Sequence, residues 1–413
     1  MRVRAPFGRV AGALLITAGL ALLASCQSQA DTPATIESAT EEMAEVRVAP
    51  QATATPTPAP TASPTPADTA TPAPSATAEP TETVMVEETA TPNATNGDDT
   101  FSPAANTAVV PHGPPGSWDS QFTDPGAVVY HDGLFHMFHN GFVGWPAPVG
   151  IAYSTSPDGY TWTRVQEEPV FRGDDLDYVG LTALASSALV EDDGTWVLYF
   201  YTWDQPTWPG APSSIGRATA PEPLGPWTAD AAPVLLTGPQ GAWDDEAVRA
   251  PSVLHTDDGY VMYYAGFDRL QGLIGMATSP DGVQWTKFDD AATTEERFVE
   301  SDPIFEPGAD DAWDADHVFH PRVVHSPAGY VMVYSAAPRL NATSTLGYAL
   351  SEDGVNWQRA AQPILDYTAV PGGRAIWFSA LEYLDGTYFL FFELGTGGET
   401  EVYLATAEDL GVQ

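Results

Sequence analysis

The strongest constraint on the fold is an internal repeat that begins near residue 108. Three stretches of twelve residues, 108–119, 233–244 and 303–314, align without gaps. Each starts with a short apolar run, has Gly at its sixth position and ends in Trp-Asp. Repetition of this kind indicates one supersecondary unit stacked several times, and it argues against a sandwich, which does not repeat.

Each copy also predicts a β-hairpin. An apolar run, a two-residue turn and an aromatic run recur five times, with the turns at Asp132-Gly133, Asp193-Gly194, Asp258-Gly259, Ala328-Gly329 and Asp385-Gly386. Asp-Gly between such runs favours a hairpin turn because Gly accepts positive φ. Three copies end in a Ser-x-Asp-Gly-x-x-Trp corner, at 156–162, 279–285 and 351–357, and the second copy carries a variant with Pro226-Trp227. The Asp side chains of these corners and of the Trp-Asp pairs suit turn caps.

These repeats predict an all-β fold, a five-bladed β-propeller over residues 107–413. Each copy holds about four short strands with no amphipathic helix between them, and four-stranded sheets repeated radially are propeller blades. The fifth copy ends near Asp409 after three strands, whereas Ala108-Val109-Val110 aligns with a last-strand segment. We therefore expect the N-terminal segment to complete blade five and close the ring.

The blades serve as controls for one another, because a residue that the fold requires should recur. One slot lies eight residues before the first turn residue of each copy, at the start of the innermost strand. Its five occupants are Asp124, Ala185, Ala250, His320 and Trp377. Asp124 is the carboxylate among them and is the best functional candidate; the alternative is that it caps its own Asp-Pro-Gly turn. His320 is an axial hydrogen-bonding group, a metal ligand or a packed histidine.

The opening blade resembles that of the five-bladed propeller glycosidases, glycoside hydrolase families 43 and 32 and their relatives. The resemblance rests on Asp-Pro-Gly-Ala-Val at 124–128, on the following Asp-Gly and Met-Phe, and on the corner at 279–285, and it covers about residues 108–410. It implies that Asp124 is the base or nucleophile. In that family a second Asp precedes the blade-three Pro and a Glu acid lies just before the blade-four Pro; Ala250 and Phe319 stand there in this chain.

Glycoside hydrolysis usually requires two carboxyl groups, so a proton donor must come from elsewhere. The candidates are Glu246 and Asp245 ahead of blade three, Asp316 ahead of blade four, and Glu393 in blade five. Glu393 aligns with Asn140, Gly266 and Ala336, so it too is specific to its blade.

Aromatic, acidic and basic side chains near the same strand ends suit a carbohydrate pocket, since aromatic faces stack on sugar rings and polar groups bond to hydroxyls. The candidate substrate-binding residues are Arg249, His320, Trp203, Asp204, Asp268 and Trp377, with Trp145, Trp208, Arg269 and Arg339 on neighbouring loops. No phosphate-binding loop or zinc-ligand cluster appears, so we predict neither a cofactor nor a metal.

The net charge of the chain limits the classes of partner that it can bind. The chain has 15 Lys and Arg against 55 Asp and Glu, a net charge of -40, and such a surface repels a polyanion, which excludes a nucleic-acid binder. We expect a monomer that hydrolyses glycosidic bonds in an oligo- or polysaccharide. The alternative is a non-catalytic glycan-binding or scaffold protein, which the missing family carboxylates favour.

The N-terminus predicts an anchor and a stalk. Three Arg residues precede the apolar run 10–23, and Leu23-Ala24-Ser25-Cys26 is similar to the lipobox of bacterial lipoproteins. We expect residues 1–25 to be a signal peptide and Cys26 to be lipidated, on the extracytoplasmic side of a bacterial cell membrane or outer membrane. The Thr, Pro and Ala-rich residues 26–106 predict a disordered linker, because no aromatic residue occurs between Phe7 and Phe101 and large apolar side chains are too few to offset the entropy of ordering.

Overall fold

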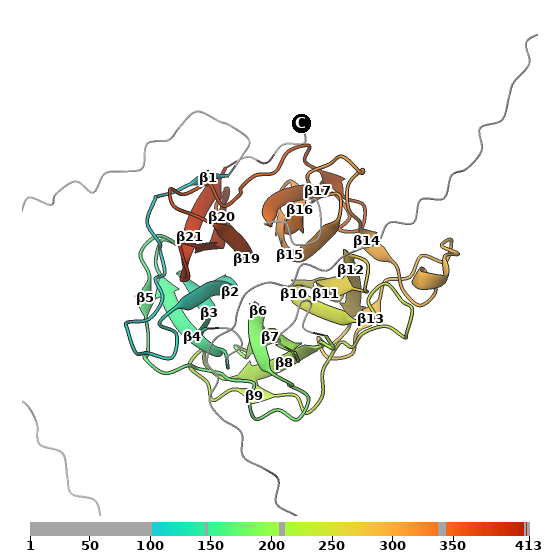
Figure 1. Cartoon of the computed structure of the whole chain (residues 1–413). Coiled ribbons are helices and arrows are strands. Elements are labelled where there is room, and N and C mark those ends of the chain that lie inside the picture. Colours follow the sequence, from blue (N-terminus) through green and yellow to red (C-terminus); the bar gives the residue numbers. More distant parts are fainter. Residues whose placement is uncertain (1–100, 145–147, 206–210, 338–343, 409, 411–413) are drawn as a thin grey trace, which may run out of the picture. The chain divides into compact units, whose positions relative to one another are not determined.

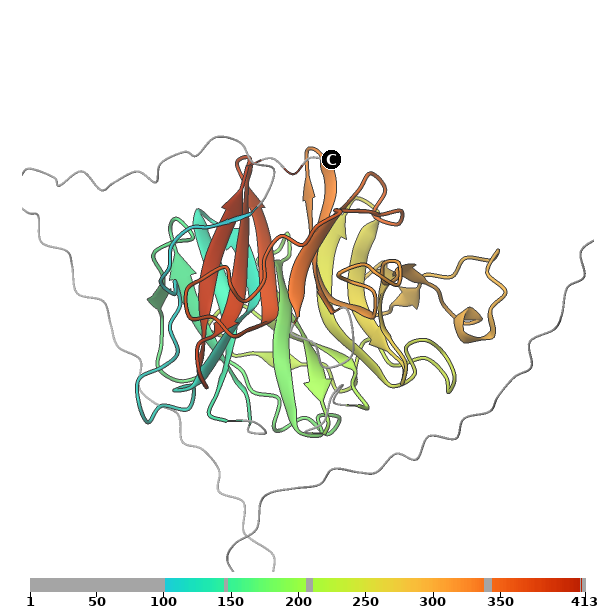
Figure 2. The same cartoon turned by 45° about the horizontal axis from the view of Figure 1, so that its top comes forward.

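The computed structural model describes residues 101–413 except 145–147, 206–210, 338–343, 409 and 411–413. Over these residues the chain forms five antiparallel sheets arranged as blades around a central axis (Figure 1). Figure 2 shows the innermost strands of neighbouring blades running side by side toward one end of that axis. The predicted five-bladed propeller is confirmed. No helix in this part of the chain is long and apolar enough to cross a membrane.

The strands of each blade follow in sequence order from the axis outward. Blade one is β2 (Phe122–His131), β3 (Leu134–Phe142), β4 (Gly150–Ser156) and β5 (Thr163–Arg164). Blade two is β6 (Thr182–Val190), β7 (Trp196–Trp203), β8 (Ile215–Ala220) and β9 (Thr228–Ala229). Blade three is β10 (Ala247–Thr256), β11 (Gly259–Phe267), β12 (Gly272–Ser279) and β13 (Thr286–Lys287), with β14 (Pro303–Phe305) also paired to β12. Blade four is β15 (His317–Ser326), β16 (Gly329–Ala337), β17 (Thr345–Ser351) and β18 (Gln358–Arg359). Blade five is β19 (Ala375–Leu384), β20 (Thr387–Gly395) and β21 (Thr400–Ala407), and a 3-10 helix, η1 (Glu296–Phe298), follows β13.

The N-terminal segment completes blade five, as expected from the sequence. β1 (Ser102–Pro103) pairs antiparallel with β21, and Val110 forms a further antiparallel bridge to Val402. Phe101 is buried in the core of this blade. The ordered fold therefore starts before residue 107, the boundary inferred from composition, because the strand that closes the ring is too short to leave a pattern.

The repeated Gly and Trp-Asp positions form one structural unit. In the copy at 233–244, the Gly238 N–H donates to the Asp244 carbonyl, and a Cβ on Gly238 would lie 2.3 Å from Asp244 Oδ1. Only a residue without a side chain fits so close to this carboxylate. The carboxylate is fully buried and pairs with Lys287 of the outermost strand at 2.5 Å. The sequence suggested that the Trp-Asp carboxylates cap turns. That prediction is wrong, because they form buried ion pairs instead.

The other two copies of this motif make the same ion pair. Asp119 pairs with Arg164 at 2.5 Å, and Asp314 pairs with Arg359. In each blade the basic residue lies on the fourth strand, so the pair connects the loop before the blade to its outer edge. The corner Asp residues do cap turns as predicted: Asp158 Oδ1 accepts the backbone N–H groups of Tyr160 and Thr161.

Two hairpin turns lie one residue earlier than the Asp-Gly pattern indicated. In blade three Thr256 pairs with Gly259, so the turn is Asp257-Asp258, and in blade four Ser326 pairs with Gly329. Gly259 is required for another reason: its φ is +114°, and a Cβ there would lie 2.5 Å from the carbonyl oxygen of Ser279. The glycine marks a close approach between strands, not the turn.

This shift changes which axial residues are equivalent. A β-bulge interrupts the innermost strand of every blade, and the last paired residue before it is Asp124 in blade one, Arg249 in blade three and Phe319 in blade four. Ala250 and His320, which the sequence comparison matched to Asp124, lie within the bulges at φ of +51° and +50°. Among the last paired residues before the bulge, Asp124 is still the one with a carboxylate. Its equivalent in blade three is the buried Arg249.

A ring of hydrogen bonds joins each blade to the next at the axis. In every case a side chain of one blade bonds to the backbone of the following blade. The pairs are Asn140 with Ala185, Ser187 with Val253, Ser252 with Val323, Arg322 with Ser379, and Glu382 with Tyr130. Because the inner edges of the blades have no neighbouring strand, these bonds satisfy backbone groups that would otherwise be unpaired.

Candidate functional site

The candidate site is centred on Asp124, which the bulge of β2 holds against the axis. The side chain is buried, with 2% exposed. Its Oδ1 accepts the Gly126 backbone N–H at 2.9 Å and the Asn140 Nδ2 at 2.8 Å, while Oδ2 has no hydrogen-bond partner among the described residues. Burial raises the pKa of Asp124 to about 7, against the opposing effects of these two donors and of the Arg322 charge. A carboxyl group in this state exchanges a proton near neutral pH.

Glu393 of β20 is the second carboxyl group at the axis. It is also buried, and its Oε2 has no hydrogen-bond partner in the described part of the chain. Burial raises its pKa well above the ordinary value, and the negative charge of Asp124 raises it further. Hydrogen bonds from the Thr400 side chain and the Phe378 backbone act in the opposite direction. Of the four sequence candidates for the acid, Glu393 is the one whose carboxyl group interacts with Asp124.

Tyr201 is a further buried polar side chain close to this pair. Tyr201 of β7 is fully buried, and burial raises the pKa of its phenol, which also feels Arg249, Asp124, Arg322 and Glu393. Its hydroxyl has no hydrogen-bond partner among the described residues. Buried polar atoms without partners are unusual in folded proteins and cluster at sites of function. Neither Tyr201 nor Arg322 was identified from the sequence.

Arg249 is a buried cation that acts on Tyr201 and His320. Its guanidinium lies 4.4 Å from the ring centre of Trp203 and 4.6 Å from that of Phe267. Burial lowers the pKa of Arg249 to about 10, so it stays charged at neutral pH. Trp203 is buried beneath this cation, and its contact with the guanidinium shows a role in positioning Arg249.

His320 and Trp377 lie together on the blade-four and blade-five side of the axis. His320 is buried, its Nδ1 is 3.0 Å from the Trp377 carbonyl oxygen, and its ring stacks on Phe378. Burial lowers the pKa of His320 well below its usual value, and the charges of Arg249 and Arg322 add to this effect, so the ring is neutral at pH 7. The Trp377 side chain is 42% exposed, as expected for an aromatic residue available to a sugar.

The remaining sequence candidates lie in loops and have partners of their own. The Glu246 carboxylate pairs with the exposed Arg269 at 2.7 Å. Asp268 Oδ2 pairs with Arg297 at 2.9 Å, and Asp204 accepts the Gly180 N–H at 3.0 Å. Two further acid candidates are also engaged, with Asp245 bonded to the Gly241 N–H and Asp316 paired with His317.

Some sequence candidates fall outside the described residues, namely Trp145, Trp208, Arg339 and Cys26. Within the described residues, no group of three or more His, Cys, Asp and Glu side chains is arranged to hold a metal ion.

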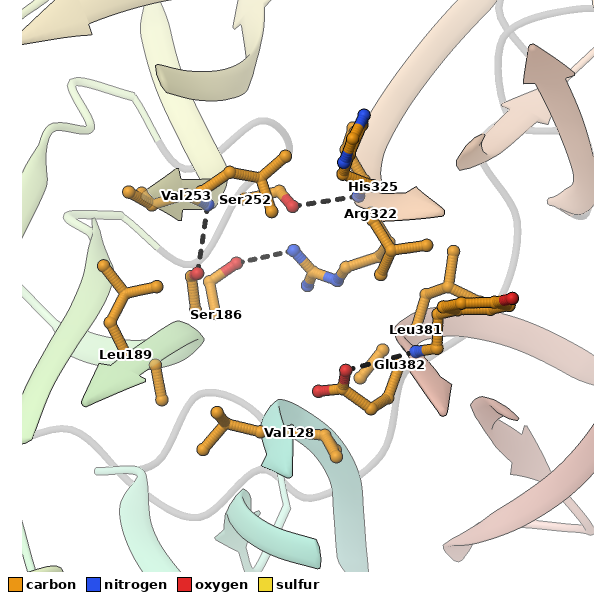
Figure 3. A pocket seen from close by; sticks show the side chains of 17 residues that line it. Val128, Ser186, Leu189, Ser252, Val253, Arg322, His325, Leu381 and Glu382 are labelled. Atoms are coloured by element: carbon orange, nitrogen blue, oxygen red, sulfur yellow. Dashed lines mark hydrogen bonds between the residues drawn. The ribbon is translucent and has the colours of Figure 1, made fainter. Parts of the chain in front are cut away.

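Arg322 lines a second space at the axis. A cavity of about 270 Å³ lies between the hairpin ends of the innermost strands, lined by Val128, Leu189, Val253, Leu381, Glu382 and Arg322 among others. Figure 3 shows Arg322 reaching across this cavity to Ser186, with Glu382 on the opposite wall. Most of the lining residues are apolar.

The fold and the axial site can be compared with those of known proteins. Residues 114–306 match the model of the glycosyl hydrolases family 32 N-terminal domain. A putative glycosidase from Bacteroides thetaiotaomicron has the same fold, with a TM-score of 0.57 and 17% identity over 76% of this chain and 98% of that one. The resemblance to five-bladed propeller glycosidases is therefore confirmed.

Two further relatives widen the range of chemistry among similar proteins. One solved structure, from work on the GH130 family of mannoside phosphorylases and its glycoside hydrolases that target beta-1,2 mannosidic linkages, has a TM-score of 0.56 and 19% identity over 77% of this chain and 95% of that one. A 1,2-beta-oligomannan phosphorylase from Thermoanaerobacter is 25% identical over 118 residues, 26% of this chain. The match spans 40% of that relative's own length. These relatives are thus described as glycosidases or as phosphorylases of mannosides.

Proposed function

We propose that the axial site cleaves glycosidic bonds, with Asp124 and Glu393 as its two carboxyl groups. The observation that carries this proposal is their pairing: each is the carboxyl group at its position in the ring, each is buried, and each has one oxygen without a hydrogen-bond partner among the described residues. Pairs of carboxyl groups whose environments differ are the usual acid and base of glycosidases.

The surroundings of the two carboxyl groups support Glu393 as the acid and Asp124 as the base or nucleophile. Asp124 has two hydrogen-bond donors on Oδ1 and the Arg322 charge nearby, which favour its ionised form. Glu393 faces the charge of Asp124, which favours its protonated form. As the glycosidic C–O bond breaks, Glu393 gives its proton to the leaving oxygen. The Asp124 carboxylate attacks the anomeric carbon or takes a proton from the attacking water.

The test is a screen of the purified protein on aryl glycosides and oligosaccharides, including β-1,2-linked mannosides, with and without inorganic phosphate. On a substrate that is cleaved, Asp124→Asn and Glu393→Gln should each lower kcat/KM by about a thousandfold. Glu246→Gln is the matched control, since that carboxylate pairs with an exposed arginine, and it should lower kcat/KM by less than about threefold. Loss of activity in Glu246→Gln with activity retained in Glu393→Gln would reassign the acid.

A second candidate function is glycan binding without cleavage. The hydrogen bonds of Asp124 favour it: Oδ1 holds Gly126 and Asn140, and Asn140 in turn bonds to Ala185 of blade two. Asp124 then supports the ring and does no chemistry. This reading predicts that no substrate is cleaved and that Asp124→Asn weakens sugar binding in calorimetry without any catalytic effect.

We also propose that the protein is anchored by a lipid on Cys26 and acts outside the cytoplasm. Support comes from the sequence alone: a basic start, an apolar run and a lone cysteine directly after it. A polysaccharide substrate is consistent with that location, because polymers do not cross the membrane.

A further inference from the structure

The axial cavity that Arg322 lines takes no part in the proposed function. Its lining includes neither Asp124 nor Glu393, because each blade contributes the part of its innermost strand that follows the bulge. The exposed His325 and the partly buried Tyr383 are the lining residues nearest the hairpin turns. The volume of about 270 Å³ is just below the range of about 300–1,000 Å³ that drug-sized ligands occupy, so the cavity suits a molecule of amino-acid size.

Two charged side chains in this lining depart from the pattern of the other blades. In the four blades whose hairpin turn has two residues, innermost strands are compared by counting residue pairs from the turn. The third pair holds an aliphatic residue in three blades and a carboxyl group in blade five: Val129, Leu254, Val324 and Glu382. The fifth pair holds a small residue in three blades and a cation in blade four: Ala127, Ser252, Ala380 and Arg322. The fold accepts uncharged side chains at both positions, so the charges need a separate reason.

Arg322 presents an unused hydrogen-bond donor to the cavity. The side chain is buried, with 4% exposed; its Nε donates to the Ser379 carbonyl and its Nη1 donates to Ser186 Oγ at 2.8 Å. Its Nη2 makes no hydrogen bond with the described residues and is not one of their fully buried polar atoms, so it is open to the cavity. Figure 3 shows the guanidinium group pointing into this space. A ligand oxygen there would supply the missing acceptor to a buried cation.

Glu382 lies on the opposite wall of the cavity (Figure 3). Its Oε2 accepts the Tyr130 N–H at 3.2 Å, and its Oε1 accepts the Tyr383 N–H at 3.1 Å. These bonds hold the carboxyl group in place, and each oxygen keeps a lone pair for a further donor. Among the described residues Glu382 forms no salt bridge with Arg322. A cation and a carboxyl group therefore face one space from two sides without contacting each other.

We propose that this cavity binds a small aliphatic α-amino acid, with its carboxylate on Arg322 and its ammonium group on Glu382. A zwitterion complements both charged walls. A ligand with a carboxylate alone would face the negative charge of Glu382, and a simple amine would face the positive charge of Arg322. Between these groups the wall is aliphatic and would cover an apolar side chain, with Val129, Leu189, Leu254 and Val324 among its residues.

The experiment is isothermal titration calorimetry of the purified full-length protein at pH 8. Burial raises the pKa of Glu382 to about 7, so its carboxylate is ionised at this pH. L-Valine should bind with a Kd of about 1 mM or tighter. Isovalerate lacks the ammonium group and isobutylamine lacks the carboxylate, and each should bind about tenfold more weakly or worse. Glycine, which lacks the apolar side chain, should also bind about tenfold more weakly.

Variants assign the binding to the cavity. Glu382→Gln and Arg322→Gln each remove a charge and keep a similar shape, and each should weaken valine binding by about tenfold or more. Glu246→Gln makes the same chemical change in a pair with an exposed arginine and should leave the Kd unchanged.

Three results would overturn the inference: no heat with valine at about 10 mM, isovalerate binding as tightly as valine, or valine binding that is unaffected by Glu382→Gln. If Arg322→Gln does not fold, Glu382→Gln and the ligand series still decide. Calorimetry with amino acids measures binding and not turnover, so the absence of glycoside cleavage would leave this result intact.

Discussion

Breaking the buried pair between Asp244 and Lys287 should strongly destabilise blade three. The Asp244 carboxylate is fully buried, the Lys287 ammonium is 2.5 Å away with 17% of its side chain exposed, and the Tyr264 hydroxyl donates to the same carboxylate oxygen at 3.2 Å. Removing one partner of a buried pair leaves an uncompensated charge and costs about 3–5 kcal/mol. Because Tyr264 still donates to the carboxylate, we expect Lys287→Met to cost about 3 kcal/mol, the lower end of that range.

Thermal unfolding measures this effect. Globular proteins unfold with an entropy of about 2 cal/mol/K per residue, so a domain of about 310 residues should lose about 5 °C in melting temperature for 3 kcal/mol. The double variant Asp244→Asn/Lys287→Met removes the uncompensated charge and should recover part of the loss. Arg269→Met is the control, because that arginine is 86% exposed in its pair with Glu246, and its melting temperature should match the wild type. A wild-type melting temperature for Lys287→Met would refute the importance of the buried pair.

Three further predictions concern the anchor, the closing segment and pH. Cys26→Ser should move the protein from the detergent phase to the aqueous phase, and unchanged partitioning would contradict the lipid anchor. Deletion of residues 1–112 removes β1 and the Val110 bridge and should lower the melting temperature, whereas deletion of residues 1–95 should not; equal melting would contradict ring closure by this segment. Because the folded-state pKa of Asp124 is raised to about 7, the folded protein holds a proton that the unfolded chain releases above about pH 4, so stability should fall as pH rises from about 4 to 7. Asp124→Asn should flatten that fall in urea titrations, and an unchanged slope would exclude Asp124 as its source.

The fold was predictable because its local signals recur. Hairpin patterns, Ser-x-Asp-Gly-x-x-Trp corners and the Gly to Trp-Asp spacing each appear in several copies, and agreement among copies outweighs the ambiguity of any one strand. The ion pairs that the Trp-Asp carboxylates form were harder to predict from the sequence. Their basic partners, such as Lys287, lie more than forty residues away on two-residue strands, and no local pattern links the two positions.

The candidate site was predictable to the extent that the blades could be aligned. Asp124 and Glu393 emerged from that comparison, and the charge of Asp124 raises the pKa of Glu393. Arg322 and the equivalence of Arg249 with Asp124 were missed, because Gly259 and Gly329 were taken as turn glycines. A glycine needed for a close approach to a carbonyl and a glycine needed in a turn look identical in one sequence, and the resulting shift of one residue moved the comparison off the relevant slot.

The two carboxyl groups lie on either side of the closing interface of the ring, and this position connects catalysis to architecture. Asp124 belongs to blade one and Glu393 to blade five, the two blades that only the closure brings together. Beside them, Thr123 donates its N–H to Thr400 Oγ1 and accepts that hydroxyl in return, both at 3.2 Å. Thr400 thus joins β21, the strand paired with the Glu393 strand, to the residue next to Asp124. Opening this interface would expose Glu393 to water and separate it from Asp124, which removes both the burial and the repulsion that raise the Glu393 pKa. The strand that completes blade five is therefore also part of what gives the site its acid.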